Sequence, residues 1–347
     1  MNRRALGLLL WLLALALLGW SLRQLPLAAM LDRIGQIAWG DLLLWIAVNL
    51  VILYLAVTRW QILTHTIQCP LPLTTLFRLR QAGSAVSFVT PGPQFGGEPL
   101  QLYWLHRSSG LAMHQAIAAL GLERFMETAT NFAVLLAGLA LLLYSAMGPA
   151  GEWLEAAVLL ALALAALLIM AALAIRHPDW LADRLQRFAG RWGTVANPDR
   201  GNSDGVDIHQ ETRPSAREGY LALIDLLRQA LTTHRATVGL AVLVSLLGWA
   251  ALLFELAVLL HALGLKPTVH DIVLIMVAMR LAMLLPVPGG LGTIEGSLVW
   301  SFGLLGLPLA AAGGLIALSR LRDAVMLLIG FVCMGSFKRQ PEAASRD

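Results

Sequence analysis

Long apolar runs alternate with short polar segments along most of this chain. A helix needs about 20 mainly apolar residues to cross a bilayer. Because a signal peptide would need small residues at a cleavage site after the first run, and none are convincing there, we expect that run to be an uncleaved helix. The runs that predict transmembrane helices are Ala5–Leu22, Gly40–Thr58, Phe125–Met147, Trp153–Ile175, Ala236–Leu263 and Arg320–Phe337.

Two further apolar regions, Gln81–Leu105 and Val269–Leu305, are each interrupted by a stretch rich in proline and glycine. Proline stops a helix, and glycine permits backbone turns that are closed to other residues. The arms on either side of each break are too short to cross a bilayer alone, so each region predicts a re-entrant hairpin. Irregular backbone at membrane depth must be buried in protein or line a wet cavity, so we expect both breaks to lie inside the molecule. The two stretches read Thr90-Pro-Gly-Pro-Gln-Phe-Gly-Gly-Glu98-Pro99 and Leu285-Pro-Val-Pro-Gly-Gly-Leu-Gly-Thr-Ile-Glu295.

The positions of the arginines predict the orientation of the chain. Cytoplasmic segments of membrane proteins are enriched in lysine and arginine. We place residues 1–4 in the cytoplasm and assume that each hairpin returns to the face from which it entered. Every arginine-rich segment then lies in the cytoplasm, and the two hairpins enter the membrane from opposite faces. This is an inverted repeat of two halves. If both hairpins crossed completely, the termini would still be cytoplasmic, so six to eight spans remain open.

The same reading divides the chain into four parts. Membrane halves at residues 1–175 and 236–337 contain the breaks at 90–99 and 285–296, respectively. Between them, residues 176–235 form an arginine-rich cytoplasmic loop with predicted amphipathic helices at Pro178–Trp192 and Tyr220–Arg235. Residues 338–347 form a cytoplasmic tail.

Composition agrees with a membrane protein, and the lack of catalytic motifs argues against an enzyme. Hydrophobic residues make up 58% of the chain and charged residues 13%, which no soluble domain of this size matches, so the fold class is an all-α polytopic membrane protein. The two cysteines fit neither a disulfide framework nor a metal site. The sequence has no P-loop, H-E-x-x-H or G-x-S-x-G motif, so we expect no enzymatic activity, cofactor or metal.

Charged residues within the apolar regions are the candidates for chemistry. Arg124 and Arg320 are each followed three residues later by an acid, Glu127 or Asp323. A charge at the bilayer centre costs about 2.5–3.5 kcal/mol on insertion scales, so it usually has a partner or a function. These arginines could bind a phosphate, form local ion pairs with the acids, or extend from helix ends to the lipid headgroups.

Acids and glycines at the breaks form the second group of candidates. Glu98 and Glu295 could cap the helices that follow the breaks, or could carry a coupling proton or cation. A helix that begins after a break points its free amides into the protein, which makes an anion site. The candidate substrate-binding residues are Arg124, Arg280, Arg320, Gly96, Gly97, Gly289 and Gly290, and the candidate coupling or capping residues are Glu98, Glu127, Glu255, Glu295 and Asp323.

The break motifs, together with Leu122-Glu123-Arg124, resemble the lysylphosphatidylglycerol synthetase transmembrane, or flippase-like, family over about residues 5–337. The resemblance implies that, in relatives fused to a soluble domain, the membrane region translocates aminoacylated phosphatidylglycerol. The soluble domain makes this lipid from charged tRNA. Residues 1–347 contain no such domain, so aminoacyl transfer is not expected of them. Some stand-alone members resemble hopanoid- or envelope-associated membrane proteins.

Together these features predict an inner-membrane lipid translocase with cytoplasmic termini. Its substrate would be a phosphate-bearing or other amphiphilic lipid, such as an anionic phospholipid or a polyprenyl- or hopanoid-type lipid, and no nucleic acid partner is expected. Two alternatives remain open. One is an ion-coupled transporter of small solutes. The other is a non-transporting scaffold or accessory of envelope lipid synthesis, with a lipid-synthesis enzyme as its partner.

Overall fold

The computed structural model describes residues 26–90, 96–145, 150–176, 232–285 and 287–338, with a few isolated positions elsewhere (16, 19, 23, 224–226, 228 and 229). The predicted first helix, most of the arginine-rich loop with its amphipathic segments, and the tail lie outside the described residues. The helices are α2 (Leu27–Gly35), α3 (Trp39–Thr66), α4 (Leu73–Val89), α5 (Glu98–Ser109), α6 (Met113–Tyr144), α7 (Ala150–Arg176), α10 (Arg235–Ala262), α11 (Val269–Met283), the 3-10 turn η1 (Pro288–Gly290), α12 (Thr293–Leu304) and α13 (Leu309–Lys338).

Four of the six predicted spans are confirmed as candidate membrane-spanning helices, and a fifth predicted span lies within the long helix α13. Helices α3, α6, α7 and α10 are long and apolar enough to cross a membrane by length and composition alone. Helix α13 has 30 residues but carries charged residues near its middle. Two predicted starts were wrong: α6 begins at Met113 rather than Phe125, and α13 begins at Leu309 rather than Arg320. An apolar run ends at a charged residue, whereas a helix continues through one whose charge is paired inside the protein.

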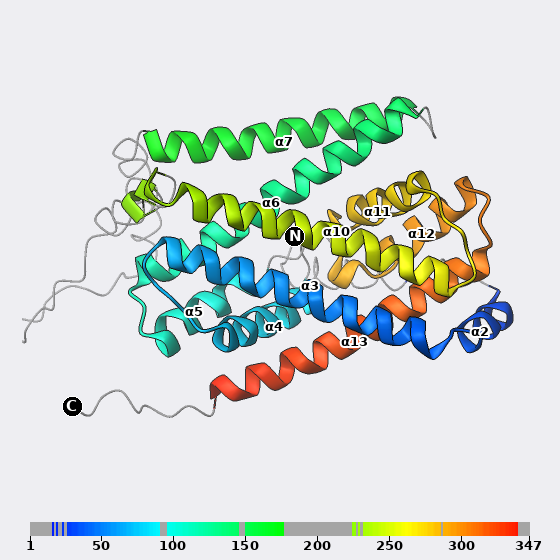
Figure 1. Cartoon of the computed structure of the whole chain (residues 1–347), viewed down its shortest axis with the longest axis horizontal. Helices are drawn as coiled ribbons and strands as arrows, with labels where there is room; N and C mark the ends of the chain where they lie inside the picture. Colours follow the sequence, from blue (N-terminus) through cyan, green and yellow to red (C-terminus); the bar gives the residue numbers. More distant parts are fainter. Residues whose placement is uncertain are drawn as a thin grey trace, which may run out of the picture.

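Four short helices form two hairpins that enter from opposite ends of the molecule. Helices α4 and α5 have 17 and 12 residues, and α11 and α12 have 15 and 12. At 1.5 Å per residue these span about 18–26 Å, less than the roughly 30 Å hydrocarbon core. Figure 1 shows α4 and α5 toward one end of the long axis and α11 and α12 toward the other.

The two halves repeat the same order of helices with similar lengths. Helices α3 and α10 both have 28 residues, while α6 and α13 have 32 and 30. Helices α3 and α10 pack against each other and run in opposite directions (Figure 1). The halves also exchange partners, because each hairpin packs against the long helix that follows the hairpin of the other half, α4 on α13 and α11 on α6.

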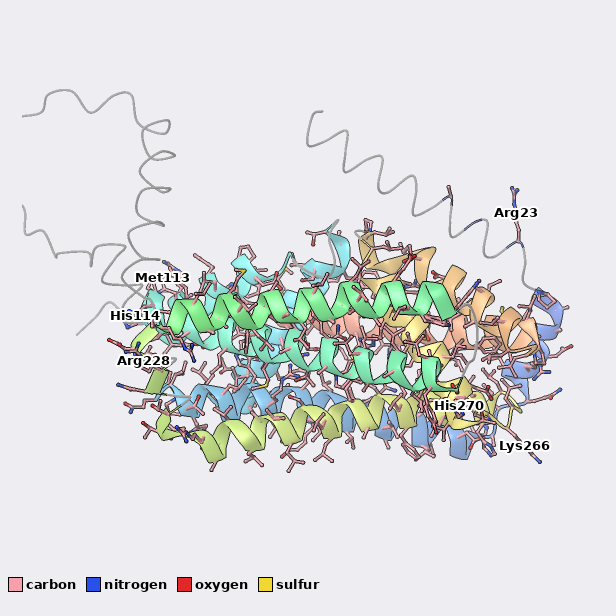
Figure 2. All side chains as sticks on the ribbon, turned by 90° about the horizontal axis from the view of Figure 1, so that it is seen from above. Arg23, Met113, His114, Arg228, Lys266 and His270 are labelled. Carbon is pink, nitrogen blue, oxygen red and sulfur yellow. The ribbon has the colours of Figure 1, made fainter. Side chains whose placement is uncertain are left out.

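The long helices expose apolar side chains along their length and polar ones near their ends. Figure 2 shows His114 and Arg228 at one end of the helices and Lys266 and His270 at the other. Large apolar side chains between the ends are exposed, among them Leu43, Leu162, Leu243 and Phe254. An apolar belt between two polar ends is the surface that a bilayer solvates.

The arms of the first hairpin touch backbone to backbone at two glycines. A Cβ placed on Gly97 would lie 2.0 Å from the carbonyl oxygen of Gly83 in α4. A Cβ on Gly83 would in turn lie 2.2 Å from the side-chain nitrogen of Gln101 in α5. A larger residue at Gly97 would push α4 and α5 apart, whereas one at Gly83 would displace the Gln101 side chain.

We expect Gly97→Ala to destabilise the protein by about 1–3 kcal/mol, because the added methyl group meets rigid backbone. The matched control is Gly121→Ala in α6, where a Cβ meets nothing within 4 Å. This control should be neutral or stabilising, since alanine favours a helix over glycine by about 1 kcal/mol. Thermal unfolding of both variants in detergent checks the difference, and equal unfolding temperatures would contradict the close contact.

Candidate functional site

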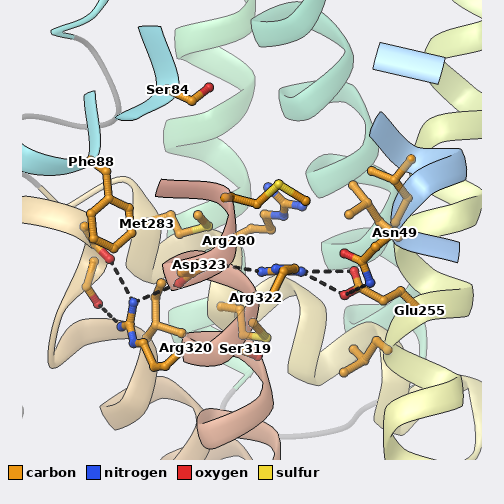
Figure 3. Close-up of a pocket in the computed structure, with 18 of the residues that line it drawn as sticks. Asn49, Ser84, Phe88, Glu255, Arg280, Met283, Ser319, Arg320, Arg322 and Asp323 are labelled. Atoms are coloured by element: carbon orange, nitrogen blue, oxygen red, sulfur yellow. Dashed lines mark hydrogen bonds and ion pairs between the residues drawn. The ribbon is translucent and has the colours of Figure 1, made fainter. Parts of the chain in front are cut away.

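A cavity of about 410 Å³ lies where the two hairpins approach each other. Its walls come from both halves, and Figure 3 shows Arg320 and Arg322 of the second half with their partners. A second cavity of about 380 Å³ adjoins it, and Arg80, Arg124, Glu127 and Arg280 line both. Apolar side chains complete the first cavity, including Phe88, Leu252, Met276, Met279, Met283 and Met326. The space is therefore amphipathic, with charged and apolar walls.

In the first half, arginines and glutamates form a continuous chain of ion pairs. Arg124 Nη1 lies 2.7 Å from Glu127 Oε2, and Arg80 Nη2 lies 2.9 Å from Glu127 Oε1. Arg80 Nη1 also lies 3.0 Å from Glu123 Oε1, and Arg59 donates two hydrogen bonds to the Glu123 carboxylate. These residues lie in three helices (α3, α4 and α6), so the chain ties the first half together.

In the second half, Arg320 is surrounded by acceptors. Its Nε donates to Glu295 Oε1 at 2.6 Å, and its Nη1 donates to Asp323 Oδ2 at 3.1 Å. The carbonyl oxygens of Gly289 and Gly290 each accept from Arg320 at 3.2 Å. Both glycines have positive φ, 58° and 61°, a conformation that glycine adopts without strain. These glycines therefore serve to turn backbone carbonyls toward an arginine.

Glu255 connects the second half to the first. Arg322 Nη1 donates to its two carboxylate oxygens at 2.9 and 3.1 Å. Trp45 Nε1 and Asn49 Nδ2 of α3 each donate to Glu255 Oε1 at 3.0 Å. The side chain of Glu255 is 5% exposed, so these four hydrogen bonds replace the water that it loses.

The repeat preserves one ion pair with its signs exchanged. Arg59 stands twenty residues after the start of α3, and Glu255 stands twenty residues after the start of α10. Arg59 pairs with Glu123 in α6, whereas Glu255 pairs with Arg322 in α13. Helix α3 thus gives the arginine to its pair with α6, whereas the equivalent helix α10 gives the acid to its pair with α13. Among the described residues, each half places three arginines and three acids in or beside the cavity: Arg59, Arg80, Arg124, Glu98, Glu123 and Glu127 in the first, and Arg280, Arg320, Arg322, Glu255, Glu295 and Asp323 in the second.

The glutamates that follow the breaks hold the break itself. Glu98 Oε2 accepts the Gly96 amide, and Glu295 Oε2 accepts the Gly292 amide, both at 2.7 Å. The Gly97 amide donates to Ser87 Oγ and the Gly290 amide to the Val287 carbonyl, so these amides, which the sequence suggested as an anion site, bind acceptors of the chain itself. Glu295 is fully buried. Capping accounts for one oxygen of each carboxylate and leaves the other to face an arginine.

The two glutamate–arginine contacts differ in quality. Glu295 Oε1 is hydrogen-bonded to Arg320. Glu98 Oε1 lies 3.2 Å from Arg124 Nε, but neither atom has a hydrogen-bond partner. The remaining Arg124 nitrogens donate to Glu127 and to Gln101. The first-half contact is consequently the looser of the two.

Arg124 and Arg320 both lie inside their helices. Arg124 stands eleven residues after Met113, and Arg320 stands eleven residues after Leu309. This is about 16 Å along the helix axis, so the alternative of arginines at helix ends does not fit. The local ion pairs with Glu127 and Asp323 do form. They are parts of larger clusters.

Arg280 is the exception among the arginines of the cavity. No ion pair joins it to another residue in the part of the chain that the structure describes. Its guanidinium carbon lies 4.8 Å from the ring centroid of Trp249, and the residue lines both cavities. A desolvated cation–π contact contributes about 2 kcal/mol, which offsets only part of the cost of a charge at this depth.

Sequence reasoning missed four members of these clusters. Arg59 and Arg80 lie beyond the ends of the apolar runs, where the positive-inside rule favours a cytoplasmic position, and Glu123 and Arg322 stand beside other charged residues. One signal was present: the interval between Arg59 and Glu255 is the same as that between Arg124 and Arg320. Comparing the halves position by position would have found the exchanged pair.

We expect Arg320→Gln to destabilise the protein by about 3–5 kcal/mol, because it leaves the buried Glu295 carboxylate without its counter-ion. Arg78→Gln is the matched control, since Arg78 is an exposed arginine of α4 outside the clusters. Adding Glu295→Gln to Arg320→Gln should recover part of the loss. Chemical or thermal unfolding in detergent measures these differences, and an Arg320→Gln variant as stable as Arg78→Gln would show that the pair contributes nothing.

Comparison with known proteins places these features in a family. Residues 5–330 match the family model described as the lysylphosphatidylglycerol synthase TM region. A UPF0104 membrane protein from Methanothermobacter thermautotrophicus is 23% identical over 283 residues, which cover 80% of each chain. No solved structure matches this chain significantly. The match confirms the resemblance carried by the break motifs. This multi-pass membrane protein therefore belongs to the family of the lysylphosphatidylglycerol synthase transmembrane region.

Proposed function

We propose that this protein translocates an amphiphilic lipid with a phosphate or similar anionic headgroup between the leaflets of the membrane. The observation that carries the proposal is the amphipathic cavity at the meeting point of two opposed half-length hairpins. Its charged wall suits a headgroup and its apolar wall suits the body of a lipid.

The physical barrier to lipid exchange is the transfer of the polar headgroup through hydrocarbon. Removing a charged group from water without a partner is costly, and an internal polar path lowers that cost. Arginine suits this task because its planar guanidinium can bind two phosphate oxygens at once. Several arginines line the cavity in the proposed path: Arg80, Arg124, Arg280, Arg320 and Arg322.

The arrangement of the hairpins supports alternating access. Transporters built from inverted repeats place discontinuous helices around a site near the bilayer midplane. Here, α4–α5 and α11–α12 approach that depth from opposite ends, and each packs against a long helix of the other half, α13 or α6. We propose that each hairpin gates the cavity on its own face of the membrane.

Family membership supports a lipid substrate, since the family is named for lysylphosphatidylglycerol synthesis. The proposed role is transport without a chemical step. Arg78, Arg107 and Arg176 lie in helices whose basic ends share one end of the molecule, which favours a cytoplasmic position for that end. This orientation in a bacterial-type inner membrane, with both termini cytoplasmic, is part of the proposal.

We expect purified protein in proteoliposomes to accelerate exchange of a fluorescent phosphatidylglycerol between leaflets, measured by dithionite quenching. Arg124→Lys and Arg320→Lys should slow this exchange, because lysine keeps the charge but loses the two-pronged contact with a carboxylate or phosphate. Arg78→Lys should exchange the lipid at the wild-type rate.

Two results would count against the proposal. If proteoliposomes with the wild-type protein exchange lipid no faster than empty liposomes, the protein is not a lipid translocase. Uptake of a soluble solute under those conditions would then support the ion-coupled transporter. Wild-type rates in both lysine variants would instead show that the geometry of these arginines does not matter to transport.

A further inference from the structure

We infer that α11 recognises the junction between the anionic group and the apolar body of the substrate, with Arg280 receiving the anion. The inference rests on the proposed function and narrows its substrate to amphiphiles that carry a single negative charge next to their apolar part. It also assigns Arg124 and Arg320 a different task, which is to hold the hairpins.

The other arginines of the cavity already face acceptors of the chain itself. Two Arg124 nitrogens donate to Glu127 and Gln101, and its Nε lies 3.2 Å from Glu98 Oε1. All three side-chain nitrogens of Arg320 contact acceptors of the chain itself. Arg322 binds Glu255, and Arg80 binds Glu123 and Glu127. A ligand that bound any of these guanidinium groups would have to displace a carboxylate or a carbonyl.

Arg280 needs no such displacement. It has no ion pair with any residue described in the structure, and it faces both cavities. Trp249 covers one face of its guanidinium group at 4.8 Å. Stacking of this kind uses the face of the plane, so the N–H groups on its edge stay free to bind an oxyanion.

Methionines lie one turn away on either side of Arg280. Met276 precedes it by four residues and Met283 follows it by three, so all three share one face of α11 and line the same cavity. Figure 3 shows Met283 beside Arg280. Methionine side chains adapt to irregular apolar shapes. This face of α11 therefore offers an anion site flanked within about 5.4 Å, one helical turn, by apolar surface.

A monoanion would give Arg280 a counter-ion. Among the described residues, Arg280 is the one arginine of the first cavity without an ion pair, since the other four each face at least one carboxylate. A phosphodiester carries one negative charge and would pair with this guanidinium group. Free phosphate would pair with Arg280 but would make no use of the apolar surface of Met276 and Met283. The acids of the wall are Glu127, Glu255, Glu295 and Asp323, and the arginines are Arg80, Arg124, Arg280, Arg320 and Arg322.

Binding to the purified full-length protein in detergent tests this assignment. Four probes separate its parts: dihexanoyl phosphatidylglycerol, dihexanoylglycerol, glycerol 3-phosphate and inorganic phosphate. We expect dihexanoyl phosphatidylglycerol to bind the wild-type protein most tightly. Arg280→Gln should weaken that binding by at least about tenfold, Arg280→Lys by less, and the control Arg78→Gln should not change it.

The unfolding temperature separates a binding role from a structural one. Because Arg280 pairs with no acid in the described part of the chain, Arg280→Gln should unfold at or above the wild-type temperature. If this variant does not fold, Trp249→Leu provides the second arm, since it removes the ring beneath the guanidinium and keeps every charge. It should also weaken binding of dihexanoyl phosphatidylglycerol.

Wild-type affinity in Arg280→Gln would overturn the assignment of the anion to Arg280. Equal affinity for inorganic phosphate and dihexanoyl phosphatidylglycerol would contradict recognition of the apolar part of the substrate by α11 and would indicate a free anion as the ligand. Failure of the proposed function looks different: the wild-type protein would bind the short-chain lipid in an Arg280-dependent way but would not exchange labelled lipid in proteoliposomes.

Discussion

The structure depends on the pairing of charges within the membrane-spanning region. Most arginines and carboxylates at this depth face one another, which offsets the cost of removing their charges from water. This pairing lets α6 and α13 continue as helices through Arg124 and Arg320, beyond the points where apolar runs end. It also fixes the breaks, because Glu295 binds a backbone amide of the break and an arginine of α13 at the same time. Hairpins that do not cross the bilayer are thereby held at a defined depth.

The inverted repeat gives these charges a shared pattern with one instructive difference. The Arg59–Glu123 pair joins α3 to α6 in the first half, and the Glu255–Arg322 pair joins α10 to α13 in the second, with the positions of arginine and acid exchanged. Glu255 also binds Trp45 and Asn49, which links the halves along the α3–α10 contact. Ion pairs also tie each hairpin to a long helix of its own half, Arg80 and Glu98 to α6 and Glu295 to α13. We therefore expect each hairpin to move together with that helix during alternating access.

The sequence predicted the architecture better than the site. Helix type, the half-length arms and the inverted order follow from apolar periodicity, proline–glycine breaks and arginine placement, which are local or additive signals. The partners of each charge do not follow, because Arg59 meets Glu123 and Glu255 meets Asn49 only after distant helices pack. The same limit applies to Gly289 and Gly290, which were expected to offer amides to an anion but turn carbonyls to Arg320. Arg280 was a candidate from sequence, but its lack of an acidic partner among the described residues is visible only in three dimensions.

The most direct test of this account is the structure of the protein in nanodiscs that contain phosphatidylglycerol, determined by cryo-electron microscopy. The account predicts lipid density in the cavity, with a phosphate in hydrogen-bonding distance of Arg280, apolar density along Met276 and Met283, and Arg320 still bound to Glu295. A cavity without lipid, with Arg280 paired to a carboxylate of the chain, would contradict it. So would a lipid phosphate bound by Arg124 or Arg320 after separation from Glu127 or Glu295.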